Sequence, residues 1–135
     1  MGEGVVGLGI DIIEIDRFVR MAGEGMAGAA SRIFTDGELG DSRAGRPDFL
    51  ASRFASKEAV MKAIGRGMGS ISFTDIEVVS SGADAPEVRL FGSAAEWAEK
   101  AGVSRILLSI SHSRDYACAS AVALGGVSNE AGLSF

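Results

Sequence analysis

The first regular pattern along the chain is an alternation of side chains from Val5 to Ile15. One side of this alternation carries four apolar residues: Val6, Leu8, Ile10 and Ile12. The other side carries Gly7, Gly9 and Asp11. A two-residue period of this kind predicts a β-strand with two chemically different faces.

A different period governs residues 49–64, where no Gly or Pro interrupts a run of good helix formers. At about 100° per residue, one face collects the apolar residues Leu50, Phe54, Met61 and Ile64. The reverse face collects the small residues Ala55, Ser56, Ala59 and Ala63. We therefore predict the longest helix here, covered on most sides and ended by the glycines at 65, 67 and 69.

Shorter elements are predicted on both sides of this helix. A short helix capped by Asp16 should run to about Met21. Two further helices should begin at capping boxes over 35–38 and 93–96, and we expect a loop over 43–48. We predict two β-hairpins: one pairs residues 71–79 with 87–91, and the other pairs residues 105–111 with 116–124. Together they predict an α+β fold, a mostly antiparallel sheet of about five strands with helices packed on one side. Residues 1–124 should form one domain, and 125–135 a flexible tail.

Composition narrows the class of protein. The 135 residues are 47% hydrophobic and 23% charged, which favours one packed domain over disorder. The net charge of −5 argues against nucleic acid as the main partner. No apolar run approaches the roughly 20 residues that span a bilayer, and residues 1–4 do not begin a secretory signal. With Cys118 as the only cysteine, no internal disulfide is possible, and we expect a cytoplasmic protein.

The predicted long helix carries more charge than a covered helix should. Lys57 falls inside its apolar stripe, and Arg53, Glu58 and Lys62 lie nearby. One interpretation is an ordinary pair between Glu58 and Lys62 on a partly exposed helix. The other is a site for a phosphorylated ligand, because buried charges need partners, cations bind phosphate and a carboxylate can hold a metal.

Asp11 is unusual because its strand neighbours are apolar residues or glycines. It could be an edge-strand aspartate that discourages aggregation. Alternatively, Asp11 and Glu58 are two oxygen ligands of Mg²⁺, which commonly takes one or two protein carboxylates. In that case Gly7 and Gly9, on the same face, would leave room for a ligand.

Two further features allow both a structural and a functional interpretation. His112, the only histidine, lies where a strand should end, and fits either a hairpin turn or a phosphate contact. The glycine-rich run at 65–69 is either a helix stop or a phosphate cradle, although it lacks the Lys-Ser/Thr of a P-loop.

Three blocks of the sequence together resemble the holo-acyl-carrier-protein synthase family of 4'-phosphopantetheinyl transferases. They are residues 9–17 (GIDIIEIDR), 53–62 (RFASKEAVMK) and 109–113 (SISHS). Residues 34–39 and 73–78 are also similar to the family, so that the resemblance runs from about residue 6 to residue 124.

The resemblance implies a homotrimer whose active sites lie between protomers. Asp11 and Glu58 would be Mg²⁺ ligands, whereas Arg53 and His112 would lie near the 3'-phosphate of coenzyme A. Lys62 would lie near the diphosphate.

The other implied contacts are peripheral. Gly65 would be a further contact of coenzyme A, and Arg17 would meet the acidic recognition helix of an acyl carrier protein. Family members often carry a second basic residue about two helical turns later, where this chain has Glu24, and we expect Arg20 to take its place.

The implied reaction is the transfer of 4'-phosphopantetheine from coenzyme A to a carrier serine, with release of 3',5'-ADP. Mg²⁺ and Lys62 would stabilise phosphate charge, and Glu58 or a water that it holds would accept the serine proton. Two alternatives remain. A hydrolase could use His112 with a neighbouring serine, although no Gly-x-Ser-x-Gly elbow is present. A non-catalytic oligomeric module that binds carrier protein or nucleotide would leave Asp11 and Glu58 unexplained.

Overall fold

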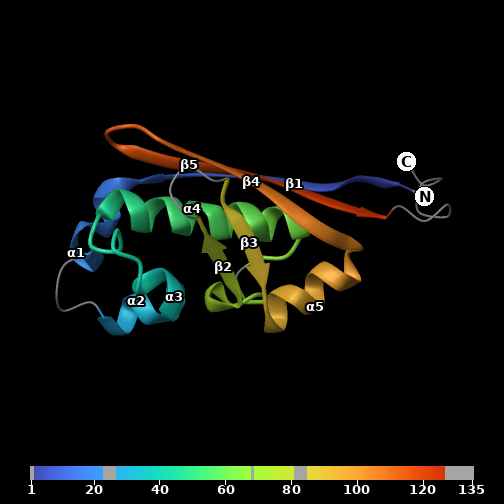
Figure 1. The fold of residues 1–135 in the computed structure, drawn as a ribbon, viewed down its shortest axis with the longest axis horizontal. Coiled ribbons are helices and arrows are strands. Elements are labelled where there is room, and N and C mark those ends of the chain that lie inside the picture. The colour runs from blue at the N-terminus through green and yellow to red at the C-terminus, as the bar shows by residue number, and fades with distance from the viewer. Residues whose placement is uncertain (1, 23–26, 68, 81–84, 127–135) are drawn as a thin grey trace.

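The computed structural model describes residues 2–22, 27–67, 69–80 and 85–126. One long helix, α4 (Pro47–Ile64), runs along one face of a three-stranded antiparallel sheet (Figure 1). The sheet has the order β1–β5–β4, formed by Glu3–Glu14, Tyr116–Gly126 and Val103–His112. The predicted α+β class with antiparallel pairing is confirmed.

The shorter helices lie on the same side of the sheet as α4 (Figure 1). They are η1 (Ile15–Phe18), α1 (Val19–Ala22), α2 (Ala27–Ile33), α3 (Asp36–Leu39), η2 (Phe73–Asp75) and α5 (Gly92–Lys100). The opposite face of the sheet carries none of the helices in the described part of the chain.

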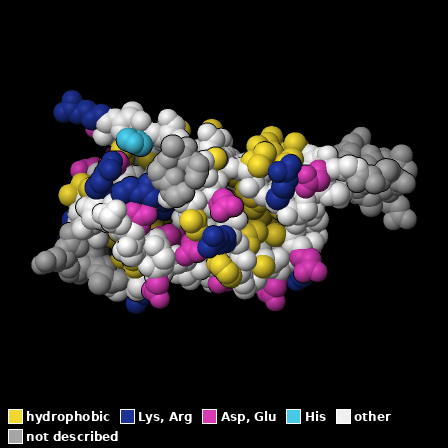
Figure 2. Space-filling model, in the orientation of Figure 1, with side chains coloured by type: hydrophobic (Ala, Val, Ile, Leu, Met, Phe, Trp, Pro, Cys, Tyr) yellow, Lys and Arg dark blue, Asp and Glu magenta, His cyan; other side chains and the backbone are white. Residues whose placement is uncertain are grey.

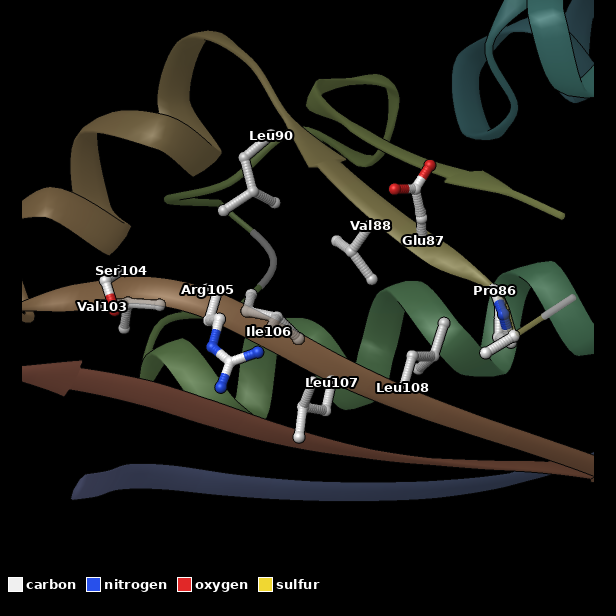
Figure 3. Close-up of a pocket in the computed structure, with 11 residues that line it drawn as sticks. Pro86, Glu87, Val88, Leu90, Val103, Ser104, Arg105, Ile106, Leu107 and Leu108 are labelled. Carbon is white, nitrogen blue, oxygen red and sulfur yellow. The ribbon is translucent and has the colours of Figure 1, made fainter. Parts of the chain in front are cut away.

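The five strands form two sheets, so the prediction of one sheet of about five strands is wrong. The second sheet is the hairpin of β2 (Ile76–Val79) and β3 (Glu87–Leu90). A groove of about 690 Å³ separates β3 from β4, and Val88 and Leu90 point into it from β3 (Figure 3). Backbone hydrogen bonds therefore do not join the two sheets at β3 and β4.

Small residues bring α4 close to the sheet. The alanines of β5 that face the helix, at 117, 119, 121 and 123, are at most 1% exposed. A Cβ atom at Gly7 or Gly9 would collide with the backbone carbonyls of Ala63 or Ala59. The expectation that these glycines leave room for a ligand is therefore wrong, because α4 itself fills the space.

The apolar face of β1 points away from α4. Leu8, Ile10 and Ile12 are each between 65% and 68% exposed, and Leu107 and Tyr116 extend the apolar surface across the sheet. Figure 2 shows hydrophobic side chains gathered at the upper edge of the molecule, over the sheet. The alternation predicted the strand correctly, but its apolar side is not the core of the single chain.

The helix signals were mostly correct. Thr35 and Glu38 form the predicted reciprocal capping box, and Gly65 ends α4 with φ of +90°. The box predicted at 93–96 is wrong: α5 begins at Gly92, and the Ser93 hydroxyl instead donates to Asp75 at 2.7 Å. Asp16 does not cap its helix either, because the N-cap of η1 is Glu14.

Three boundaries also differ from the prediction. α4 begins at Pro47 because proline suits the first turn, so the predicted loop over 43–48 ends two residues early. η2 takes the first half of the strand predicted at 71–79. β5 runs to Gly126, and the rest of the predicted tail lies outside the described residues. Across the described part of the chain, no helix combines the length and hydrophobicity needed to cross a membrane.

Candidate functional site

An acidic cluster lies where β1 meets α4. Asp11 is on the helix-facing side of β1, opposite Ala119 of β5. Lys62 Nζ lies 3.3 Å from Asp11 Oδ1 and donates to the Ile10 carbonyl at 3.0 Å. Burial and the nearby charge of Asp11 raise the pKa of Glu58, whereas Lys62 opposes this rise. The structure thus brings together three of the predicted site residues.

The Asp11–Glu58 pair has the chemistry of a divalent-cation site. The negative charge of Asp11 contributes to the raised pKa of Glu58, and a bound cation would relieve that repulsion. No third metal-ligating side chain joins them within the described ranges, but Mg²⁺ commonly takes only one or two protein carboxylates. Lys62 pairs with Asp11 and not with Glu58, so the simple intrahelical pair is not what forms.

A cationic pocket lies at the other edge of the sheet. Arg53 of α4 and His112, the last residue of β4, line one cavity of about 340 Å³. The cavity also contains Arg43, Arg46, Asp48, Phe49 and Ser80. Figure 2 shows the histidine beside a group of Lys and Arg side chains. The predicted association of Arg53 with His112 is therefore present in the geometry.

Arg53 is held in place at the back of this pocket. It is only 5% exposed, stacks 4.2 Å from the Phe49 ring centroid and donates to Ser80 Oγ at 2.6 Å. Its Nε is a buried nitrogen without a hydrogen-bond partner among the described residues. Burial and the charge of Arg43 lower the pKa of Arg53, so an anion in the pocket would stabilise its cationic form.

Arg43, Arg46 and Ser80 were missed from the sequence. The guanidinium of Arg43 forms two hydrogen bonds with Asp41, at 2.9 and 2.8 Å, and donates to the Ser80 carbonyl at 3.0 Å. Arg46 makes the equivalent pair with Asp48. The signal available was two arginines within the segment that we interpreted as a loop, at the start of the helix that carries Arg53.

Lys57 belongs to the core and not to either cluster, which corrects its assignment to the phosphate site. Its side chain is fully buried, and Nζ lies 2.8 Å from Glu38 Oε1. Nζ also donates to the carbonyls of Phe73 and Ile76. All three ammonium protons therefore have acceptors inside the protein.

The acidic cluster and the cationic pocket lie on opposite edges of the sheet. Asp11 is on β1 and His112 is on β4, and β5 runs between these strands with α4 packed across it. The lining of the cationic pocket contains none of the acidic-cluster residues. A single chain therefore does not bring together all the predicted site residues.

The remaining predicted residues lie outside both clusters. Arg17 of η1 and Arg20 of α1 are exposed. Gly65 is exposed directly after α4, and its N–H bonds to the carbonyls of Met61 and Lys62. Gly65 therefore acts as a helix stop, one turn beyond Lys62.

Comparisons with known proteins follow the same residues. Residues 7–121 match the 4'-phosphopantetheinyl transferase superfamily. The holo-[acyl-carrier-protein] synthase of Desulforudis audaxviator is 40% identical over 124 residues, which cover 90% of this chain and 94% of that protein.

Solved structures agree with this match. That of holo-[acyl-carrier-protein] synthase from Neisseria meningitidis superposes with a TM-score of 0.77 at 36% identity, covering 89% of this chain and 98% of that one. The Bacillus anthracis synthase, in complex with CoA (3',5'-ADP), has a TM-score of 0.69 at 36% identity, covering 90% and 98%.

Proposed function

Because the chain belongs to the 4'-phosphopantetheinyl transferase superfamily, we propose that it acts as a holo-[acyl-carrier-protein] synthase. It would move the 4'-phosphopantetheine arm of coenzyme A to a serine of an apo-acyl carrier protein and release 3',5'-ADP. The observation that carries the proposal is the cationic pocket around the buried, incompletely paired Arg53. A related synthase of the same fold has been solved with CoA (3',5'-ADP).

The cationic pocket would bind the 3'-phosphate of coenzyme A. Arg53 lines the cavity from α4, and His112 lines it from the end of β4. The oxygens of a phosphate dianion would accept charge-assisted hydrogen bonds from the side chains that line this pocket. Lys62 and Gly65, at the far end of α4, would contact the diphosphate.

Asp11 and Glu58 would hold Mg²⁺, which supplies positive charge to phosphate oxygens when it is bound. The serine oxygen of the carrier attacks the phosphorus that bears pantetheine, and the bond from that phosphorus to the oxygen of 3',5'-ADP breaks. Glu58, or a water beside it, accepts the serine proton, consistent with a pKa raised by burial. Lys62 offsets negative charge on the departing phosphate.

A homotrimer would explain two otherwise costly features. The exposed apolar face of β1, β5 and β4 is the kind of surface that proteins cover by association. The separation of the acidic cluster from the cationic pocket would be resolved if each site combined Asp11 and Glu58 of one protomer with the neighbour's cationic pocket. Arg17 and Arg20, exposed on the first helical turns, would then face an acidic carrier protein.

The decisive experiment is intact-mass spectrometry of an apo-acyl carrier protein incubated with this protein, coenzyme A and Mg²⁺. We expect a mass gain of one phosphopantetheine and a matching amount of 3',5'-ADP. Omission of Mg²⁺ with added chelator should prevent the gain. Binding of coenzyme A and carrier protein without any mass gain would instead favour a non-catalytic binding module.

A further inference from the structure

One carboxylate lies inside the pocket that otherwise collects positive charge. Asp48, in the first turn of α4, lines the cavity together with Arg46, Arg53 and His112. Its two oxygens accept from Arg46 Nε at 3.2 Å and Arg46 NH2 at 2.6 Å. Asp48 Oδ2 is also 3.8 Å from His112 Nε2. A negative group therefore lies beside Arg46 and His112, two residues that line the proposed phosphate pocket.

Asp48 is a carboxylate at neutral pH. Hydrogen bonds from Arg46 lower its pKa, and the charges of Arg46 and His112 act in the same direction. Its side chain is 22% exposed, compared with 60% for Arg46, so the carboxylate is the more fixed partner. Its charge is therefore a lasting feature of the pocket.

We propose that Asp48 is an internal competitor of the 3'-phosphate, which weakens the binding of 3',5'-ADP and speeds its release. A phosphate that enters the pocket finds Nε and one further N–H of Arg46 already bonded to Asp48, and the two anions repel each other. This role rests on the function proposed above. It concerns the product especially, because 3',5'-ADP retains the 3'-phosphate and must leave before the next turnover.

Removal of the Asp48 carboxylate changes the affinity for 3',5'-ADP in opposite directions for the two roles that Asp48 could have. If Asp48 served to position Arg46 for the phosphate, its removal would weaken binding. If it competes, its removal strengthens binding, and only for ligands that carry a 3'-phosphate. Adenosine 5'-monophosphate, which lacks that group, is the matched ligand.

The test is isothermal titration calorimetry of Asp48→Asn with 3',5'-ADP and with adenosine 5'-monophosphate. We expect 3',5'-ADP to bind about three- to five-fold more tightly, which is the upper part of the usual range for exposed ion pairs, and the monophosphate to change less than about two-fold. Asp36→Asn is the control, since Asp36 is an exposed aspartate in the first turn of α3 outside the pocket. It changes the net charge equally and should alter neither affinity.

Asp48→Glu keeps the charge and should keep the wild-type preference within about two-fold, which separates the loss of charge from a change of shape. If Asp48→Asn folds poorly, Asp48→Ser also removes the carboxylate and should show the same tighter binding of 3',5'-ADP. Weaker binding of 3',5'-ADP by Asp48→Asn, or an unchanged ratio between the two ligands, overturns the competitor role alone. A wild-type protein that binds neither nucleotide overturns the proposed function and, with it, this inference.

Discussion

Replacement of Lys57 by methionine should be among the most destabilising single changes in this protein. Methionine preserves the apolar stem but removes the ammonium that pairs with Glu38 and bonds to two backbone carbonyls. Glu38, which is 2% exposed, would keep the N–H groups of Thr35 and Val78 but would lose its only described cationic partner. Breaking a buried pair in this way typically costs about 3–5 kcal/mol. That is a large share of the roughly 5–15 kcal/mol that stabilises a typical domain.

The measurement is the free energy of unfolding in urea, at one fixed protein concentration because association would shift it. Lys62→Met is the matched control on the same helix: its side chain is 54% exposed, so it should cost less than about 1 kcal/mol. Glu38→Gln combined with Lys57→Met should lose clearly less than the sum of the single changes, since neither charge then remains buried. A Lys57→Met loss no larger than that of Lys62→Met would refute the view that this buried pair needs both partners.

Four further predictions follow from the site and its surfaces. Asp11→Asn and Glu58→Gln should each lower phosphopantetheine transfer at least about 100-fold. Their circular dichroism should stay unchanged, because both side chains lie outside the core. Turnover near that of the wild type would exclude these residues from the metal site. Arg53→Ala should raise the KM for coenzyme A about ten-fold or more but that for dephospho-coenzyme A far less, since only the 3'-phosphate differs; equal losses would place Arg53 elsewhere. Ile10→Asp puts a charge on the exposed apolar sheet face and should lower the oligomer mass measured by light scattering, whereas an unchanged mass would exclude that face from the interface. Arg17→Glu should raise the KM for the carrier protein, because it replaces an exposed positive charge with a negative one. Added salt should also raise this KM for the wild type, because salt screens exposed charge pairs. A carrier KM that changes with neither Arg17→Glu nor salt would contradict docking at Arg17.

Local chemistry explains why several elements could be predicted. The segment at 49–64 contains only helix-compatible residues, and Gly65 supplies the left-handed conformation that ends the helix. Thr35 and Glu38 satisfy each other's backbone donors within four residues. Such patterns need no distant partner, so they can be read directly from neighbouring residues.

The motif residues were recognisable for a related reason. Asp11 and Glu58 are carboxylates at positions where an apolar strand and a covered helix would not normally place them. That conflict between residue type and surroundings pointed to a site before any geometry was known. By contrast, Arg43 and Arg46 sit in a segment where charge is ordinary, and nothing local distinguished them.

What the sequence by itself determined was therefore the identity of the elements, the unusual charges and the family they resemble. Tertiary structure decided which charge had which partner: Lys57 and Arg53 lie one turn apart on α4, yet Lys57 is neutralised by Glu38 in the core and Arg53 opens onto a pocket. It also decided which face of β1 is buried. The glycine face packs inward because only residues without a Cβ allow α4 to approach, and the apolar face is left outside. Both outcomes depend on contacts between segments distant in the chain, which no local period encodes.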